Sequence, residues 1–124
     1  MNRMLIATCL SFAFLSGPSL AGDFDAGLEA YNSGKFTRAA NIWNELAVNG
    51  NKDAQYTLAY MYQTGKGVDQ DDVRAYSWYR IASDEGHSLA QLQIVRIKSR
   101  LLQMAEAEAM KEEVARTLTA KAEY

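Results

Sequence analysis

The chain has 124 residues, enough for one domain, and its 48% hydrophobic and 23% charged residues are typical of a folded rather than a disordered protein. Its net charge of −2 at pH 7 provides no basic surface for phosphate groups, which argues against nucleic acid and anionic lipid as partners. With 1 His and 1 Cys, the sequence lacks the usual catalytic and metal-ligand sets. We therefore expect no enzyme activity, no metal and no cofactor.

The first 21 residues have the three parts of a secretory signal peptide. Arg3 gives a positive start, an apolar run covers residues 4–15, and a small-residue cleavage signal ends at Ala21. Residues 16–18, Ser-Gly-Pro, interrupt the run before it reaches the roughly 20 apolar residues that a membrane-spanning helix needs. We expect cleavage after Ala21, a mature protein that starts at Gly22 in the periplasm or outside the cell, and no mature transmembrane segment.

Cleavage at this site changes both the charge and the thiol content of the protein. It removes Arg3, which takes the net charge from −2 to −3, and it removes Cys9, the only cysteine. An exported domain without cysteine has no disulfide bond, so its core alone must stabilise the fold. Lipidation of Cys9 is disfavoured, because the apolar run continues beyond it.

Two similar units follow one another after the predicted signal peptide. Trp43 and Trp78 are 35 residues apart, whereas Tyr31 and Tyr62, upstream of them, are 31 residues apart. The first unit therefore lacks about four residues in its middle loop. A period of this length is typical of helical repeat proteins. No stretch alternates apolar and polar residues over the length of a strand, so we expect an all-α protein.

Apolar residues at helical spacing, separated by glycine-containing turns, predict five helices in chain order. Gly65 and Gly67 suit the left-handed backbone that ends a helix, and Asp71 can cap the first amide groups of the next one. The predicted helices lie near residues 24–33, 36–48, 52–64, 71–84 and from 88 onward.

The last predicted helix contains neither glycine nor proline from Ser88 to Lys121. Its apolar stripe, which includes Ile97, slips to another face of the helix before Val114, which predicts a bend or break near residues 103–105. Two hypotheses stay open for residues 105–124: a cap folded over the last repeat, or an arm that docks on a partner. A membrane-surface helix would be richer in basic residues.

An acidic cluster precedes the fourth predicted helix. A calcium loop that starts at Asp69 would need glycine at its sixth position and glutamate at its twelfth, but both positions hold arginine. We interpret Asp71 as a helix cap and Asp69 and Asp72 as solvated charges. His87 has no second histidine to complete a metal site, so we interpret it as a solvent-exposed or capping residue.

The second unit, residues 51–86, resembles the Sel1-like repeat, a relative of the tetratricopeptide repeat. It meets that pattern at Ala54, Leu58, Ala59, Tyr62, Gly65, Gly67, Val68, Asp71, Ala75, Trp78, Tyr79, Ala82 and Gly86. Residues 22–50 resemble a shortened unit, and residues 87–124 would form a C-terminal capping helix or helices. The resemblance implies an all-α helical-repeat solenoid of about two repeats that acts as a non-catalytic adaptor for other proteins.

In tetratricopeptide-like units the first helices line the concave face, and this register implies a binding surface for a protein or peptide partner. Its carboxylates would lie at one end, its tyrosines centrally and its arginines at the other end. Two alternatives stay open: Tyr56 and Tyr60 only pack against neighbouring helices, or the chain completes a larger repeat protein through its open end. The candidate residues are Asp25, Glu29, Asn32, Asp53, Tyr56, Tyr60, Gln63, Gln93, Arg96 and Arg100.

Overall fold

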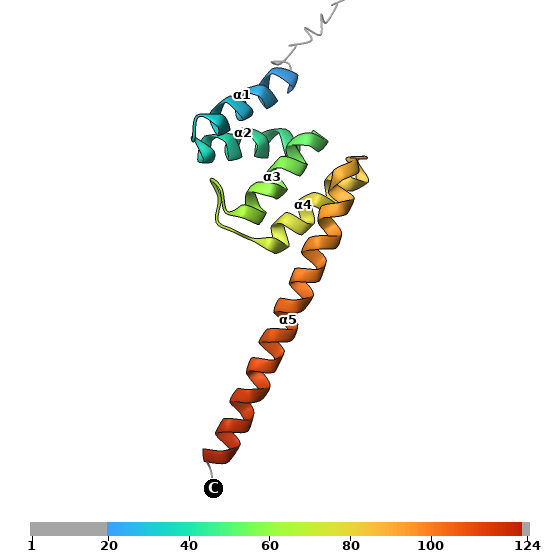
Figure 1. The fold of residues 1–124 in the computed structure, drawn as a ribbon. Helices are drawn as coiled ribbons and strands as arrows, with labels where there is room; N and C mark the ends of the chain where they lie inside the picture. Colours follow the sequence, from blue (N-terminus) through green and yellow to red (C-terminus); the bar gives the residue numbers. More distant parts are fainter. Residues whose placement is uncertain (1–19, 123–124) are drawn as a thin grey trace, which may run out of the picture.

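The computed structural model describes residues 20–122 of the chain, which form five helices joined by loops (Figure 1). Within these residues there is no strand, so the predicted all-α fold is confirmed. Residues 1–19, which make up most of the predicted signal peptide, lie outside the described residues. The helices are α1 (Leu20–Asn32), α2 (Phe36–Val48), α3 (Lys52–Thr64), α4 (Asp72–Asp84) and α5 (Ser88–Ala122).

Helix ends are fixed by local chemistry that the sequence predicts. The Asn51 side chain accepts a hydrogen bond from the Ala54 amide at 2.9 Å at the start of α3, and Asp71 accepts one from the Arg74 amide at 3.0 Å at the start of α4. Gly65 ends α3 with a left-handed backbone, φ 71°. The predicted roles of Asp71 and Gly65 are confirmed.

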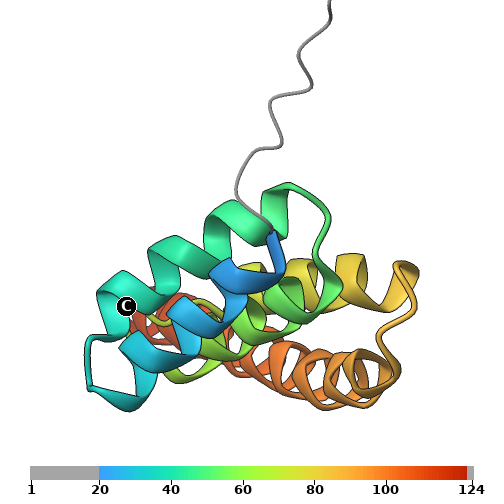
Figure 2. The ribbon, with the colours of Figure 1, turned by 90° about the horizontal axis from the view of Figure 1, so that it is seen from above.

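Each helix packs against the next one in the chain, as the two views in Figures 1 and 2 show. The helices enclose two groups of buried side chains. The first group joins α1, α2 and α3 around Trp43 and Leu58, and the second joins α3, α4 and α5 around Tyr79 and Ile97. Alanines such as Ala75, which is fully buried, let the helices approach closely.

Helix α5 has two parts with different surroundings. Ala90, Ile94 and Ile97 are buried in the second group, whereas every residue from 102 to 122 is exposed. We call residues 102–122 the arm. It extends beyond the repeats as a continuous helix, so the prediction of a bend near residues 103–105 is wrong, and so is the hypothesis of a cap folded over the last repeat (Figure 1).

Local interactions explain why the arm stays helical without tertiary packing. Most of its residues are strong helix formers such as alanine, glutamate and leucine. Arg116 contacts Glu112 at 2.9 Å one turn earlier, and Lys111 lies 3.5 Å from Glu108. A shift in the apolar stripe predicts a bend only where the stripe must keep facing the same core, and the arm faces none.

Candidate partner-binding surface

The ten predicted binding residues lie on α1, α3 and α5, which are the first helices of the successive units. Seven of them are exposed, whereas Tyr56, Gln63 and Gln93 are half-buried. Contacts within the chain hold four of the ten residues, which are Asp53, Tyr56, Gln63 and Arg100.

Tyr56 belongs to a junction between α3 and the start of α5. Its ring stacks on His87, with centroids 4.3 Å apart and planes 11° apart, and meets Tyr79 edge-on at 5.4 Å. Tyr56 therefore packs against neighbouring side chains, which is the alternative that stayed open for it in the sequence analysis. Asp53 lies at the edge of the junction, with its Oδ1 3.5 Å from His87 Nε2.

His87 is mostly buried, because only 14% of its side chain is exposed. The interpretation of this residue as solvent-exposed is therefore wrong, and the cap at this position uses its backbone rather than its imidazole. Its backbone amide donates a hydrogen bond to the Ala82 carbonyl at 2.8 Å, beyond the last turn of α4. No local sequence pattern indicates that this position lies beneath Tyr56.

Gln63 is tied to the core by Tyr79. The Tyr79 hydroxyl donates a hydrogen bond to Gln63 Oε1 at 2.9 Å. Burial raises the pKa of the Tyr79 phenol, since the charged form would lose its hydration. Gln63 thus satisfies a buried hydroxyl, which limits what its own oxygen can offer to a partner.

Asp72 and Arg100 form an ion pair between α4 and α5. Arg100 Nη2 donates to Asp72 Oδ1 at 2.7 Å, and the Asp72 side chain is only 7% exposed. Gln70 Nε2 donates to the same oxygen at 3.3 Å. The interpretation of Asp72 as a solvated charge is therefore wrong. Because the two partners are 28 residues apart, local sequence patterns do not predict the pair.

Tyr60 is the exposed aromatic residue of the candidate surface, with 42% of its area accessible. Asp25, Glu29 and Asn32 are exposed on α1, and Arg96 is exposed on α5. Within the described residues, these five side chains take part in none of the salt bridges or side-chain hydrogen bonds of the fold. They are therefore available for contacts with another molecule.

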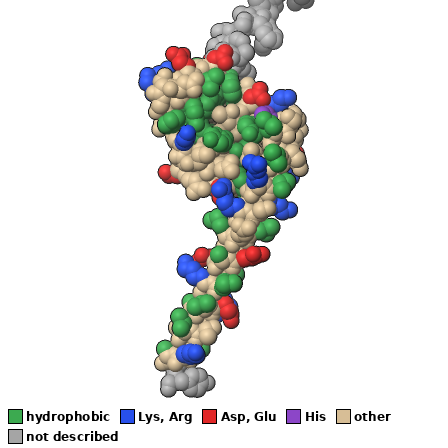
Figure 3. Space-filling view, viewed as in Figure 1, with side chains coloured by type: hydrophobic (Ala, Val, Ile, Leu, Met, Phe, Trp, Pro, Cys, Tyr) green, Lys and Arg blue, Asp and Glu red, His purple; other side chains and the backbone are tan. Residues whose placement is uncertain are grey.

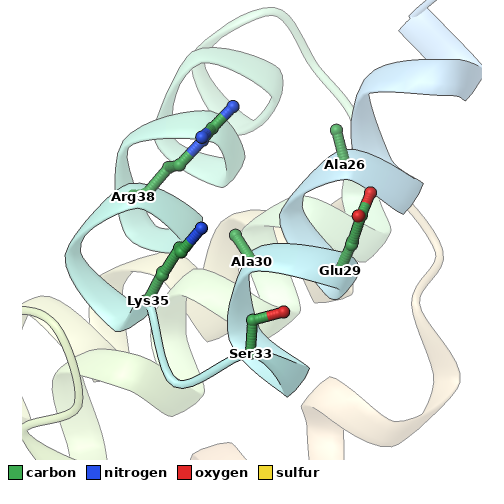
Figure 4. A pocket seen from close by; sticks show the side chains of 6 residues that line it. All are labelled: Ala26, Glu29, Ala30, Ser33, Lys35 and Arg38. Carbon is green, nitrogen blue, oxygen red and sulfur yellow. The ribbon is translucent and has the colours of Figure 1, made fainter.

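Two hollows lie on these helices, and only the first is lined by a candidate residue, Glu29. One, of about 100 Å³, lies between α1 and α2, with Glu29 on one side and the basic side chains of Lys35 and Arg38 on the other (Figure 4). A wider one, of about 590 Å³, lies between α4 and α5 and includes Arg80 and Lys98. Sequence reasoning missed these four basic residues, whose only signal is their position on exposed helix faces.

The described residues contain neither a cluster of metal ligands nor a membrane-spanning helix. Within residues 20–122, no group of three or more His, Cys, Asp or Glu residues is placed to hold a metal ion. In the same part of the chain, no helix is both long enough and apolar enough to cross a membrane.

Comparisons with known proteins identify the repeat. Residues 52–87, which contain α3 and α4, match the family described as the Sel1 repeat. An exopolysaccharide production negative regulator of Rhizobium leguminosarum bv. viciae is 33% identical over 86 residues, covering 66% of this chain and 32% of that protein. A protein of the same name from Rhizobium meliloti (strain 1021) is 32% identical over 63 residues, covering 51% of this chain and 24% of that protein.

The chain spans about a third or less of the length of these two relatives. The matched family segment coincides with the unit in which α3 and α4 pack through Ala59, Ala75, Tyr79 and Ala82. The match, the two relatives and the order of the helices agree, and we conclude that residues 52–87 of this chain form a Sel1 repeat.

Proposed function

We propose that the chain is an exported, non-catalytic adaptor that binds a protein or peptide partner through the concave face formed by α1, α3 and α5. Proteins with Sel1 repeats typically act by binding other proteins. The observation that carries the proposal is the aromatic side chain of Tyr60, which remains 42% exposed on α3, the first helix of the second unit. Exposed tyrosines of this kind often dominate binding energy.

The charges on this face favour a polar, extended partner segment. Asp25 and Glu29 lie on α1, and Arg96 lies on α5, so a face formed by α1, α3 and α5 would be negative at one end and positive at the other. A segment with the opposite order of charges would bind in one direction along the face. Tyr60 would then be the central anchor.

The names of the relatives favour a regulatory role for this binding. Both are exopolysaccharide production negative regulators, and both contain a stretch similar to this chain. We propose that this chain also lowers the output of a cell-envelope process by holding a partner protein, with no chemical step of its own. A capture experiment with cell-envelope extract would identify the partner.

Binding tests with the captured partner check the predicted surface. We expect Tyr60→Ala to cost about 2 kcal/mol, which is roughly a thirtyfold rise in Kd, because it removes the aromatic anchor. Arg96→Glu should also weaken binding, because it reverses the charge at the basic end. Arg80→Glu on α4 is the matched control and should leave the affinity unchanged. Unchanged affinity in both Tyr60→Ala and Arg96→Glu would place the site on α2, α4 or the arm.

The open end of the repeats favours a second candidate function, in which the chain completes a larger repeat protein. Val95 and Leu102 of α5 are exposed beside the hollow between α4 and α5. The equivalent face of α3, which includes Ala59, is covered by α4. Capture of a larger repeat protein from the extract would favour this function, and capture of an unrelated receptor or enzyme would favour the first.

Export is tested by the mass of the mature protein. We expect it to begin at Gly22, since the small residues that end at Ala21 form a signal-peptidase site. Cleavage there would remove Leu20 and Ala21 from the start of α1. Mass spectrometry of protein from the cell envelope checks this expectation. A mature chain that still carries Arg3 would contradict it and indicate a membrane-tethered protein.

A further inference from the structure

One face of α5 is apolar at both ends and has no partner within the described residues. At 3.6 residues per turn, Leu89 and Leu92 at the start of the helix lie on the same side as Met110, Val114 and Leu118 of the arm. All five side chains are more than half exposed. Hydrophobic side chains are visible along the arm in Figure 3. The opposite side of the helix packs against α4, so this face is open along its whole length.

Part of the face matches itself when it is reversed about Gln103. Leu92 and Val114 are each 11 residues from Gln103, on either side of it, and the small residues Ser99 and Ala107 are each 4 residues from it. In an antiparallel pair of α5 helices centred on Gln103, Leu92 of one copy would meet Val114 of the other. Ser99 would meet Ala107 of the other copy, which lets the two backbones approach closely near the centre.

The charges of α5 select the same antiparallel arrangement. Residues 88–105 contain three basic residues and no acidic one, whereas residues 106–113 contain four glutamates and one lysine. Antiparallel pairing about Gln103 sets residues 93–100 of one copy opposite residues 106–113 of the other. Arg96 is then the basic residue next to the acidic stretch, because Arg100 is paired with Asp72 and Lys98 lines the hollow between α4 and α5. Parallel pairing would set like charges against each other.

We propose that this face binds a second copy of the chain, with the two α5 helices packed antiparallel about a two-fold axis near Gln103. Such an interface uses the same patch on both copies, so it closes after two chains and leaves neither arm uncovered. This goes beyond the proposed function, because it requires no other protein. Arg96 belongs to both surfaces, so a second copy and a partner protein would compete for it.

Sedimentation analysis of the purified protein over a dilution series tests the proposal. We expect a dimer that dissociates on dilution. Val114→Glu should raise the dimer Kd at least about 100-fold, because a carboxylate in the apolar contact loses its hydration. Thr119→Glu makes the same charge change on the opposite side of the arm and should alter Kd by less than about threefold. Circular dichroism checks that both variants keep their helices.

A charge exchange tests the direction of pairing. Arg96→Glu alone and Glu113→Lys alone should each weaken the dimer, since each sets like charges against each other near the same contact. The double variant should recover most of the lost affinity. A single-chain mass at every concentration would overturn the proposal. So would equal weakening by Val114→Glu and Thr119→Glu, or additive effects of the two charge changes.

Discussion

Replacing Trp43 with alanine is expected to cost about 3–5 kcal/mol of unfolding free energy, a large part of the roughly 5–15 kcal/mol that stabilises a typical domain. Trp43 is only 2% exposed. The centroid of its ring lies 5.6 Å from that of Phe24 and 5.8 Å from that of Tyr31. Its Nε1 donates a hydrogen bond to the Phe24 carbonyl at 3.3 Å. The substitution would therefore leave a large cavity between α1 and α2.

Urea denaturation followed by circular dichroism measures this cost, and Trp78→Ala is the matched control. Trp78 is half-buried at the boundary of the two groups of core residues, so its removal leaves a site that water can partly fill. We expect the Trp43 variant to lose more stability than the Trp78 variant. Equal losses would show that the first unit is packed more loosely than its burial indicates.

The two tryptophans also show the limit of a repeat pattern. Both occupy the same place in their units, and the pattern is more complete around Trp78, yet Trp43 is the more deeply buried. The difference comes from Gly27 of α1, where an added Cβ would overlap the Trp43 indole. Gly27 thus makes room for the ring, and a lone glycine within a helical pattern does not reveal which side chain lies above it.

The helices could be predicted from the sequence because their signals are local. The starts of α2, α3 and α5 agree with the predicted residues, and α4 begins one residue later than predicted. Glycines with positive φ and capping side chains act within a few residues of a helix end, so a short stretch of sequence contains the necessary information.

The contacts that define the candidate surface could not be predicted in the same way. The pairing of Asp72 with Arg100 and the stacking of Tyr56 on His87 each join residues on different helices. They depend on the angle and offset at which the helices pack, and the apolar pattern does not fix either quantity to within a side-chain length. The sequence therefore identifies the helices that form the surface, but not which of its side chains remain available to a partner.

The loop between α3 and α4 connects the second unit to the first. Lys66 Nζ donates to the Tyr31 hydroxyl at 3.1 Å and lies 5.4 Å from the centre of the Phe36 ring. The hydrogen bond to Tyr31 raises the pKa of Lys66. Next to it, the backbone of Gly67 lies against the first turn of α2. This loop is the part of the repeat that the first unit has in shortened form.

Gly67→Ala is expected to cost about 3 kcal/mol, because it adds a steric clash to a strained backbone. Gly67 has a φ of 72°, and a Cβ at this position would overlap the Phe36 carbonyl group and lie 2.9 Å from the Thr37 amide nitrogen. Both are backbone atoms, which cannot rotate away as a flexible side chain could. The loop must therefore move off α2, and the contacts of Lys66 with the first unit should weaken as well.

The variant Gly50→Ala measures the cost of backbone strain without a steric clash. Gly50 also has a positive φ, 93°, but a Cβ there meets nothing within 4 Å, so we expect a loss of only about 1–2 kcal/mol. Denaturation of the two variants under the same conditions gives the difference directly. Equal losses of unfolding free energy would mean that the loop moves away from α2 at no cost. The close approach of Gly67 to α2 would then not hold the two units together.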